Sequence, residues 1–172
     1  WVNFNKKNWV LNIVGPGEKK YIRELNQLIK KLNVQNVNLR SGFVSDKIKN
    51  NLFENANGFI LPTKSENFGI VIIEAMSYGI PVITTHEAPW EEIFHKDCGW
   101  WVKANVKSIS GAINKLIHIS DNERFQKGIN GHKLVNSKYT WDSKGVKALN
   151  LHSWLHHSKI KKPSFVYYNN IN

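Results

Sequence analysis

The chain has 172 residues, 41% of them hydrophobic, which suits one domain with a packed core and argues against a disordered chain. Its apolar runs reach only about six residues, which excludes a membrane-spanning helix. The lone Cys98 excludes an internal disulfide framework and a thiolate metal cluster. Because the chain opens on Trp1 and its one methionine is Met76, we expect it to be part of a longer protein.

A surplus of positive charge is the second bulk property. The 24 Lys and Arg against 13 Asp and Glu give a net charge of +11. Such a field attracts phosphates, so nucleic acid, an anionic membrane surface and a phosphorylated small molecule all stay open as partners. Base-reading surfaces favour arginine, which occurs only at positions 23, 40 and 124. The simplest interpretation of the scattered lysines is a solvated surface.

Short apolar strands alternate with amphipathic helices along the chain. In chain order we predict a strand over 9–14, a helix over 18–32, a strand over 37–40, a helix over 45–53 capped by Ser45, a strand over 58–61, a helix over 69–78, a strand over 80–83, an edge strand over 99–102, and helices over 106–119, 121–135 and 141–156.

This alternation predicts an α/β fold, a doubly wound parallel sheet with helices on both faces. We expect one domain over residues 1–158. Residues 159–172 show no hydrophobic period, so we expect a loosely ordered tail there.

The first candidate ligand loop is Gly15-Pro16-Gly17, which follows the first predicted strand. In open parallel sheets, ligands bind outside the carboxyl ends of the strands. Two glycines allow close approach of a ligand, but G-x-G without a third glycine is a weak phosphate motif. A tight strand-to-helix turn explains the loop equally well.

The segment Leu61–Met76 holds the stronger candidate site. A helix that begins near Phe68 and Gly69 presents free backbone N–H groups and the positive end of its dipole, which suits a diphosphate. The helix is apolar on all sides apart from Glu74, so we expect it to be buried and Glu74 to have a polar partner.

Glu66 and Glu74 stand eight positions apart, which is about 12 Å of helix. That length is close to the separation of ribose and hexose in a nucleotide-sugar, so Glu74 is a candidate for the ribose and Glu66 for the hexose hydroxyls. Two alternatives remain open. Glu66 may be read as a helix-start acid favoured by the dipole, and Glu74 as a structural carboxylate paired with a basic neighbour.

The segment Ser65–Met76 resembles the signature of the retaining family-four (group 1) glycosyltransferases. Segment 11–17 resembles the family's first glycine turn, 42–44 its second, 75–83 its strand return and 99–102 its glycine-led edge strand. The resemblance covers residues 9–157. It implies the Rossmann-like C-terminal half of a GT-B fold, lacking its first elements, in which this half binds the nucleotide-sugar donor.

The resemblance also implies roles for individual residues. Glu66 is the implied catalytic residue and contacts the transferred sugar, Glu74 binds the ribose, and the Phe43-Val44 turn meets the base edge. Lys64 supplies charge beside Glu66, with a solvated lysine as the alternative. The implied donor-binding set is Gly15, Phe43, Val44, Lys64, Glu66, Phe68, Gly69, Ile70, Val71 and Glu74.

The reaction that the resemblance implies is sugar transfer with retention, from a UDP- or GDP-linked donor to a polysaccharide or glycolipid acceptor. No metal is implied, and the sequence has no DxD motif. The acceptor would bind through an N-terminal domain absent here, in a cytoplasmic protein with peripheral contact at the inner face of the membrane. An Arg and a Lys that neutralise the leaving diphosphate are also absent, so we expect this piece alone to be inactive.

Two other function classes stay open. The charge of +11 suits a non-catalytic basic module that binds nucleic acid or an anionic membrane. Phosphorolysis or sugar-phosphate synthesis can use the same architecture, since fold alone does not fix the reaction. His86 follows the fourth predicted strand and could border the cleft or be structural, whereas Cys98 has no base nearby and is not expected to be a nucleophile.

Overall fold

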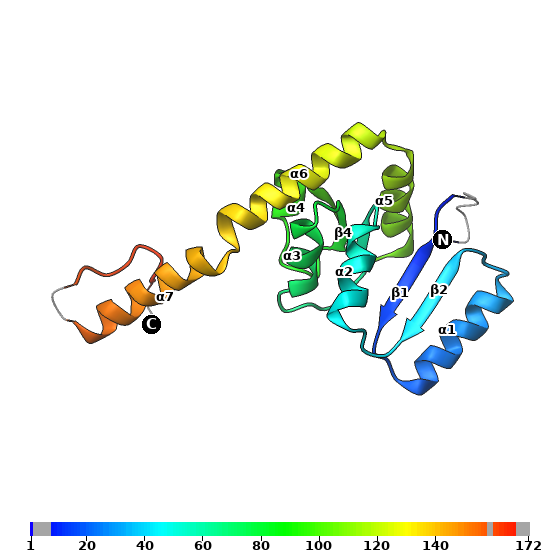
Figure 1. The fold of residues 1–172 in the computed structure, drawn as a ribbon, viewed down its shortest axis with the longest axis horizontal. Coiled ribbons are helices and arrows are strands. Elements are labelled where there is room, and N and C mark those ends of the chain that lie inside the picture. The colour runs from blue at the N-terminus through cyan, green and yellow to red at the C-terminus, as the bar shows by residue number, and fades with distance from the viewer. Residues whose placement is uncertain (2–7, 158–159, 168–172) are drawn as a thin grey trace.

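The computed structural model describes residues 1, 8–157 and 160–167 of the chain (Figure 1). Strands and helices alternate, and a run of helices closes the chain. The elements are β1 (Leu11–Gly15), α1 (Lys19–Lys31), β2 (Val37–Ser41), α2 (Asp46–Glu54), β3 (Phe59–Leu61), α3 (Ile70–Ser77), β4 (Val82–Thr85), α4 (Glu92–His95), β5 (Gly99–Val102), α5 (Val106–His118), α6 (Asp121–Lys138) and α7 (Trp141–His156).

The strands of the described residues pair only in parallel, as predicted, and they form two sheets. β1 pairs with β2, with Leu11 opposite Val37. β3, β4 and β5 form the second sheet, with Val82 of the central strand opposite Phe59 on one side and Gly99 on the other. The predicted α/β fold of parallel strands is therefore confirmed, and the division between two sheets is a feature that the alternation of elements did not reveal.

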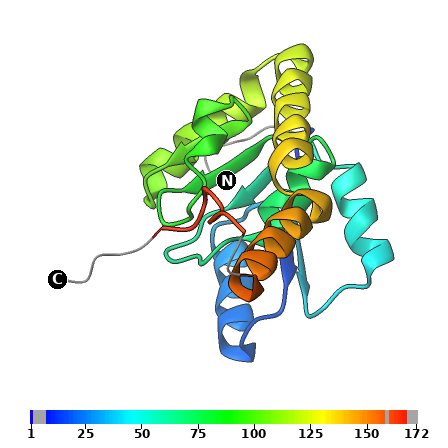
Figure 2. The ribbon, with the colours of Figure 1, turned by 90° about the vertical axis from the view of Figure 1, so that its left-hand side faces the viewer.

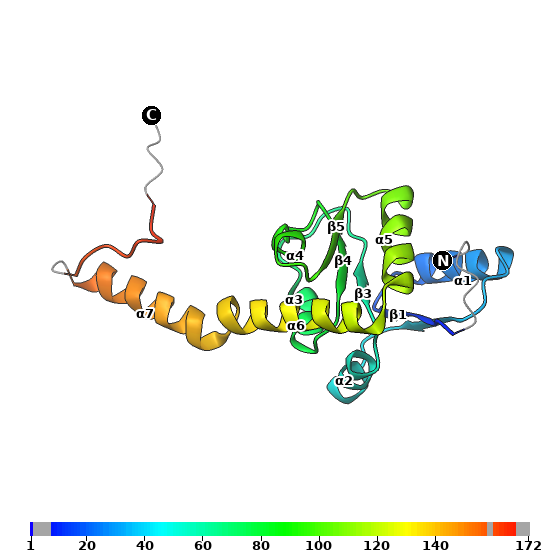
Figure 3. The ribbon, with the colours of Figure 1, turned by 90° about the horizontal axis from the view of Figure 1, so that it is seen from above.

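The three-stranded sheet is the centre of the hydrophobic core. Successive residues of β4 face opposite sides: Val82 packs with residues of α3 and α6, whereas Ile83 packs with residues of α5. Figure 3 shows α5 on one side of these strands and α3 and α4 on the other. All four residues of β4 are buried, as expected for a central strand covered on both faces.

Helix α6 crosses α3 at close range through glycine. A methyl group added to Gly128 would lie 1.9 Å from the carbonyl oxygen of Gly79, and one added to Gly131 would lie 3.2 Å from the Met76 side chain. Glycine at these positions lets the two helices approach backbone to backbone. This contact fixes the C-terminal end of α3, and with it the direction of the helix.

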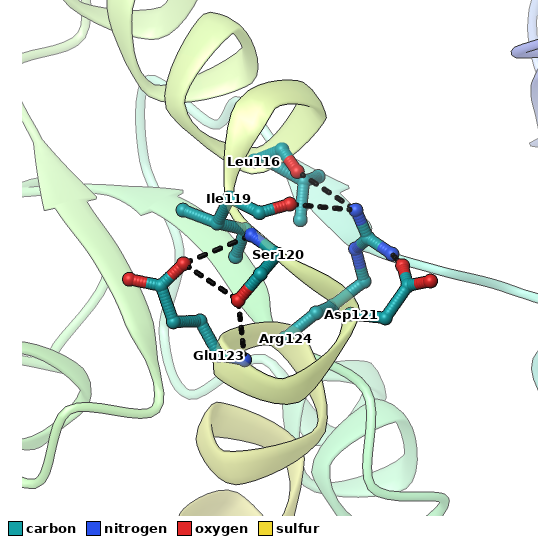
Figure 4. A network of polar contacts seen from close by, with 6 residues as sticks. All are labelled: Leu116, Ile119, Ser120, Asp121, Glu123 and Arg124. Carbon is teal, nitrogen blue, oxygen red and sulfur yellow. Dashed lines mark hydrogen bonds and ion pairs between the residues drawn. The ribbon is translucent and has the colours of Figure 1, made fainter.

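The junction between α5 and α6 is held by a polar network (Figure 4). Ser120 Oγ accepts a hydrogen bond from the Glu123 amide at 3.2 Å, and the Glu123 carboxylate accepts from the Ser120 amide and hydroxyl, both at 2.9 Å. This is a capping box, which satisfies amides at the start of α6. Arg124 pairs with Asp121 at 2.5 Å and donates to two carbonyl oxygens at the end of α5, at 3.5 and 3.3 Å.

Helices α6 and α7 follow one another (Figure 2), and α7 extends away from the sheets (Figures 1 and 3). Residues 163–165 lie beside α7, where together with the helix they line a hollow of about 710 Å³. The predicted loose tail over 159–172 stays a prediction, since 159 and 168–172 lie outside the described residues. Among the residues that the structure describes, no helix is both long and apolar enough to cross a membrane.

Several predicted boundaries are wrong by a few residues. The strand expected over 80–83 lies at Val82–Thr85, because the Ile80 amide still bonds the Ala75 carbonyl at 3.2 Å as part of the turn after α3. Ser45 occupies the position before α2, but its side chain makes no capping hydrogen bond. The single-turn helix α4 was not predicted, since four residues are too few to show a period.

Candidate functional site

The candidate site is built around the N-terminus of α3. Gly69 precedes the helix with a φ of +76°, a left-handed conformation that glycine adopts without strain. Among the residues that the structure describes, no side chain caps the helix. Its first amide groups therefore lack a side-chain acceptor, which is the arrangement that suits an anion.

Glu66 lies at the mouth of this helix, next to Gly69. Its Oε1 accepts a hydrogen bond from the Phe68 amide at 3.2 Å, and its own amide donates to the Glu87 carbonyl at 3.2 Å. A methyl group on Gly69 would lie 3.3 Å from Glu66 Cγ. The bond to the Phe68 amide agrees with the alternative that Glu66 is an acid placed at the start of the helix. Glu66 is half-buried beside that helix start.

Glu74 lies on the outer face of α3, on the same side as Ile70, four residues earlier. Ile70 is 68% exposed and the Glu74 side chain 35% exposed, so the prediction of a helix buried on all sides is wrong. The buried residues Ile72, Ala75 and Met76 lie on the opposite face, and Val71 and Ile73, partly buried, also pack against the core. Residues 66–69 are not helical, so only the four steps from Ile70 to Glu74 contribute a helical rise, which is about 6 Å and not the roughly 12 Å expected for eight helical residues.

Glu74 is paired with Lys49 of α2. Lys49 Nζ donates to Glu74 Oε1 at 2.8 Å and lies 3.6 Å from Asp46 Oδ1. The hydrogen bond and the charge of Glu74 raise the pKa of Lys49. This contact is the alternative that the sequence left open for Glu74. The sequence did not single out Lys49, because no local motif distinguishes it from the other lysines.

An aromatic cluster supports the loop before α3. The Trp90 indole N–H donates to the Phe68 carbonyl, and the Phe68 and Trp90 rings are 5.5 Å apart. Tyr139, at the end of α6, lies 5.1 Å from Trp90, and its hydroxyl donates to Glu92 at 2.6 Å. Burial and the Glu92 carboxylate raise the pKa of Tyr139. These residues were missed because they meet only in the folded chain.

The loop after β4 is tied to the loop that carries Glu66. The Thr85 hydroxyl donates to the Thr63 carbonyl at 2.6 Å, and the Glu87 carbonyl holds the Glu66 amide. His86, for which the sequence left open a place beside the cleft or a structural role, packs its ring 4.1 Å from that of Trp101, with Nε2 3.3 Å from the Trp101 carbonyl oxygen. His86 therefore anchors this loop to β5.

The two glycine turns meet at the end of the two-stranded sheet. The Gly42 amide donates to the Gly15 carbonyl at 3.0 Å, and both glycines have positive φ, +103° and +149°. Phe43 is 92% exposed and Val44 is half-buried. Among the described residues, no hydrogen bond or ion pair joins these turns to Glu66 or Glu74. Lys49, on the helix that follows them, provides the observed link to α3.

The other predicted groups are less constrained. Lys64 is exposed, which agrees with the alternative of a solvated lysine. The two hollows of about 710 and 450 Å³ are lined by other residues than Glu66 and Glu74. No group of three or more His, Cys, Asp or Glu side chains suited to a metal ion occurs within the described ranges.

Cys98 is buried, and burial raises its pKa to about 11.

Comparison with known proteins decides the family. The sequence profile of the family described as "Glycosyl transferases group 1" matches residues 2–133. The chain belongs to the group 1 glycosyl transferase family. A Methanocaldococcus jannaschii protein named as an uncharacterized glycosyltransferase is 30% identical over 151 residues, which cover 86% of this chain and 37% of the relative.

One further relative agrees with this assignment, and a solved structure shares the fold. The capsular polysaccharide biosynthesis glycosyltransferase CapM of Staphylococcus aureus is 37% identical over 99 residues, 56% of this chain and 25% of the relative. The C-terminal domain of a group 1 glycosyl transferase, LpcC of Francisella tularensis, has the same fold, with a TM-score of 0.65 and 24% identity over 80% of this chain and 73% of that one. The matched part of the chain thus spans 37% and 25% of the length of these two curated relatives.

Proposed function

We propose that this chain is the donor-binding domain of a retaining glycosyltransferase that uses a nucleotide-sugar. Membership of the group 1 family and the fold of a GT-B C-terminal domain support the proposal. The observation that carries it is local. Glu66 lies at the N-terminus of α3, Glu74 lies about one turn into the helix on its exposed face, and among the described residues no side chain caps that N-terminus.

In the proposed complex, each part of the donor meets a different part of this segment. The diphosphate lies at the N-terminus of α3, where Gly69 lets it approach the amides of Ile70 and Val71. The sugar hydroxyls meet Glu66, and the ribose hydroxyls meet Glu74. The base would extend toward the Phe43-Val44 turn, which follows the second glycine turn.

The remaining parts of the proposal concern the whole protein. The acceptor is a polysaccharide or a glycolipid, as the capsular name of the Staphylococcus aureus relative suggests. The acceptor binds through a domain outside this chain. We propose no resident metal, as the family resemblance implies, and assign stabilisation of the diphosphate within this chain to the N-terminus of α3. We place the full protein in the cytoplasm, in peripheral contact with the membrane.

Calorimetry on the chain with UDP, GDP and their sugar conjugates tests the proposal. We expect one nucleotide series to bind, and Glu66→Gln to weaken the nucleotide-sugar more than the free nucleotide. Glu24→Gln, at an exposed acid of α1, is the matched surface control, expected to leave the ratio of the two affinities unchanged. Indifference to every nucleotide would refute the proposal, and binding of RNA that vanishes with salt would favour a basic module instead.

A further inference from the structure

Helices α2 and α3 contact each other through two side-chain pairs that are spaced alike on both helices. Lys49 of α2 bonds Glu74 of α3 at 2.8 Å. One turn later on each chain segment, Phe53 stacks on Tyr78 with ring centroids 5.4 Å apart and an interplanar angle of 27°. Both pairs thus follow an i, i+4 step, so the aromatic contact sets the register of the ionic one.

The aromatic pair is the fixed end of this contact. Phe53 is 8% exposed and also packs against Phe59 of β3, with ring centroids 6.0 Å apart. Because α2 is anchored there, the Lys49 side chain extends from a fixed backbone toward the exposed face of α3. An ordinary surface ion pair has two mobile partners, whereas here Phe53, the one buried residue of α2, holds that helix at a point one turn from Lys49.

The ion pair uses part of the hydrogen-bonding capacity of Glu74. A carboxylate has two oxygens that together accept about four hydrogen bonds. Lys49 donates to Oε1, and the Glu74 side chain stays 35% exposed. The pair therefore orients the carboxylate without covering it. Lys49 remains cationic, since its pKa is raised by the Glu74 bond and charge.

We propose that Lys49 is the positioning residue for ribose recognition: by holding Glu74 through one oxygen, it presents the other to the ribose hydroxyls of the donor. The inference rests on the proposed function and adds to it a residue that acts through Glu74. A nucleotide that lacks ribose hydroxyls gains nothing from Lys49.

The test compares ribose forms of one nucleotide on matched variants of the whole chain. Calorimetry first finds whether UDP or GDP binds better, and then measures that nucleotide and its 2′,3′-dideoxy form. Lys49→Met removes the charge at nearly constant length, and Lys49→Arg keeps it. Lys47→Met, an exposed lysine of the same helix, is the control for net charge.

We expect Lys49→Met to weaken the ribonucleotide about tenfold, the size of one charge-assisted hydrogen bond, and to leave the dideoxy form unchanged. Lys49→Arg should restore most of the loss, and Lys47→Met should change both forms little and equally. Thermal melting verifies that each variant folds, and Lys49→Gln replaces Lys49→Met if the latter does not.

Two results would overturn the inference alone. Equal weakening of both ribose forms would make Lys49 structural, and tighter binding by Lys49→Met would make it a competitor for Glu74. Failure of the unmodified chain to bind any nucleotide would be a different result, since it would overturn the proposed function and this inference together.

Discussion

The Gly69 turn offers the sharpest test of how the site is built. Alanine at this position must adopt a φ of +76°, which costs an L-residue about 1 kcal/mol relative to glycine. Its methyl group would also lie 3.1 Å from Ile72 Cδ1 and 3.3 Å from Glu66 Cγ, closer than ordinary contact. Overpacking of this size adds about 1 kcal/mol. The reduced freedom of the unfolded chain offsets about 0.5 kcal/mol.

Gly79 provides the matched control at the other end of α3. Its φ is +70°, nearly that of Gly69, but an added methyl group would meet nothing closer than 3.9 Å. Gly79→Ala therefore carries the same backbone strain without the contacts. We expect Gly69→Ala to lower the free energy of unfolding by about 1.5 kcal/mol and Gly79→Ala by about 0.5 kcal/mol.

Urea denaturation measures the stability difference, and calorimetry measures nucleotide-sugar binding. Gly69→Ala should weaken that binding at least tenfold, at about 1.4 kcal/mol per decade, because the methyl group displaces Glu66 and crowds the anion site. Gly79→Ala should leave binding unchanged. If both variants lose the same stability and bind equally well, the close contacts at Gly69 have no role in the site and the reasoning fails.

Three further predictions concern the scaffold. Gly128→Ala should lower the free energy of unfolding by about 3 kcal/mol, because the methyl group meets a carbonyl oxygen of the turn after α3. Gly111→Ala, whose methyl group has nothing within 4 Å, should raise the free energy of unfolding by about 0.5 kcal/mol. Urea denaturation that ranks the two variants the other way would contradict the α3–α6 contact. Burial raises the pKa of Glu92, but hydrogen bonds from Lys138 and Tyr139 outweigh it and the net pKa lies below 4.5. The stability that Glu92 contributes is therefore present above pH 4.5 and is lost as the pH falls through the lower folded-state pKa. The difference in urea midpoint between the natural chain and Glu92→Gln should therefore shrink on acidification. A difference that grows would refute the pairing. Cys98, buried and with its pKa raised to about 11, should react with iodoacetamide at pH 8 only on unfolding, and mass spectrometry that finds rapid labelling of the native chain would show otherwise.

Much of the fold could be predicted because the sequence patterns that indicate each strand and helix lie within that element. The edge strand 99–102 was predicted with the bounds that the structure has, and helix 141–156 likewise. The segment from Glu66 to Glu74 was recognised as a loop leading into a helix, since glycine, apolar residues and the two acids stand close together in the chain. The start of that helix differs from the prediction by one residue.

The site differs from the prediction where distant residues meet. Helix α3 was expected to be buried because its own residues are apolar. Burial also depends on whether another element covers each face of the helix, and the eight residues of α3 do not by themselves indicate which elements will pack against them. The Ile70 face is open for that reason. The Trp90 bond to Phe68 and the Tyr139 bond to Glu92 join residues 22 and 47 positions apart, so no local pattern predicts them.

The sequence by itself determined the order of strands and helices, the parallel α/β class and the family. The hydrophobic period, the glycine positions and the acidic motif that predict them each lie within a short stretch of the chain. Only the tertiary structure decided that the strands form two sheets and that Lys49 bonds Glu74. The reason is physical: a hydrogen bond or ion pair forms only when its atoms lie within about 4 Å, and the packing of Phe53 on Tyr78 is what brings those helices together.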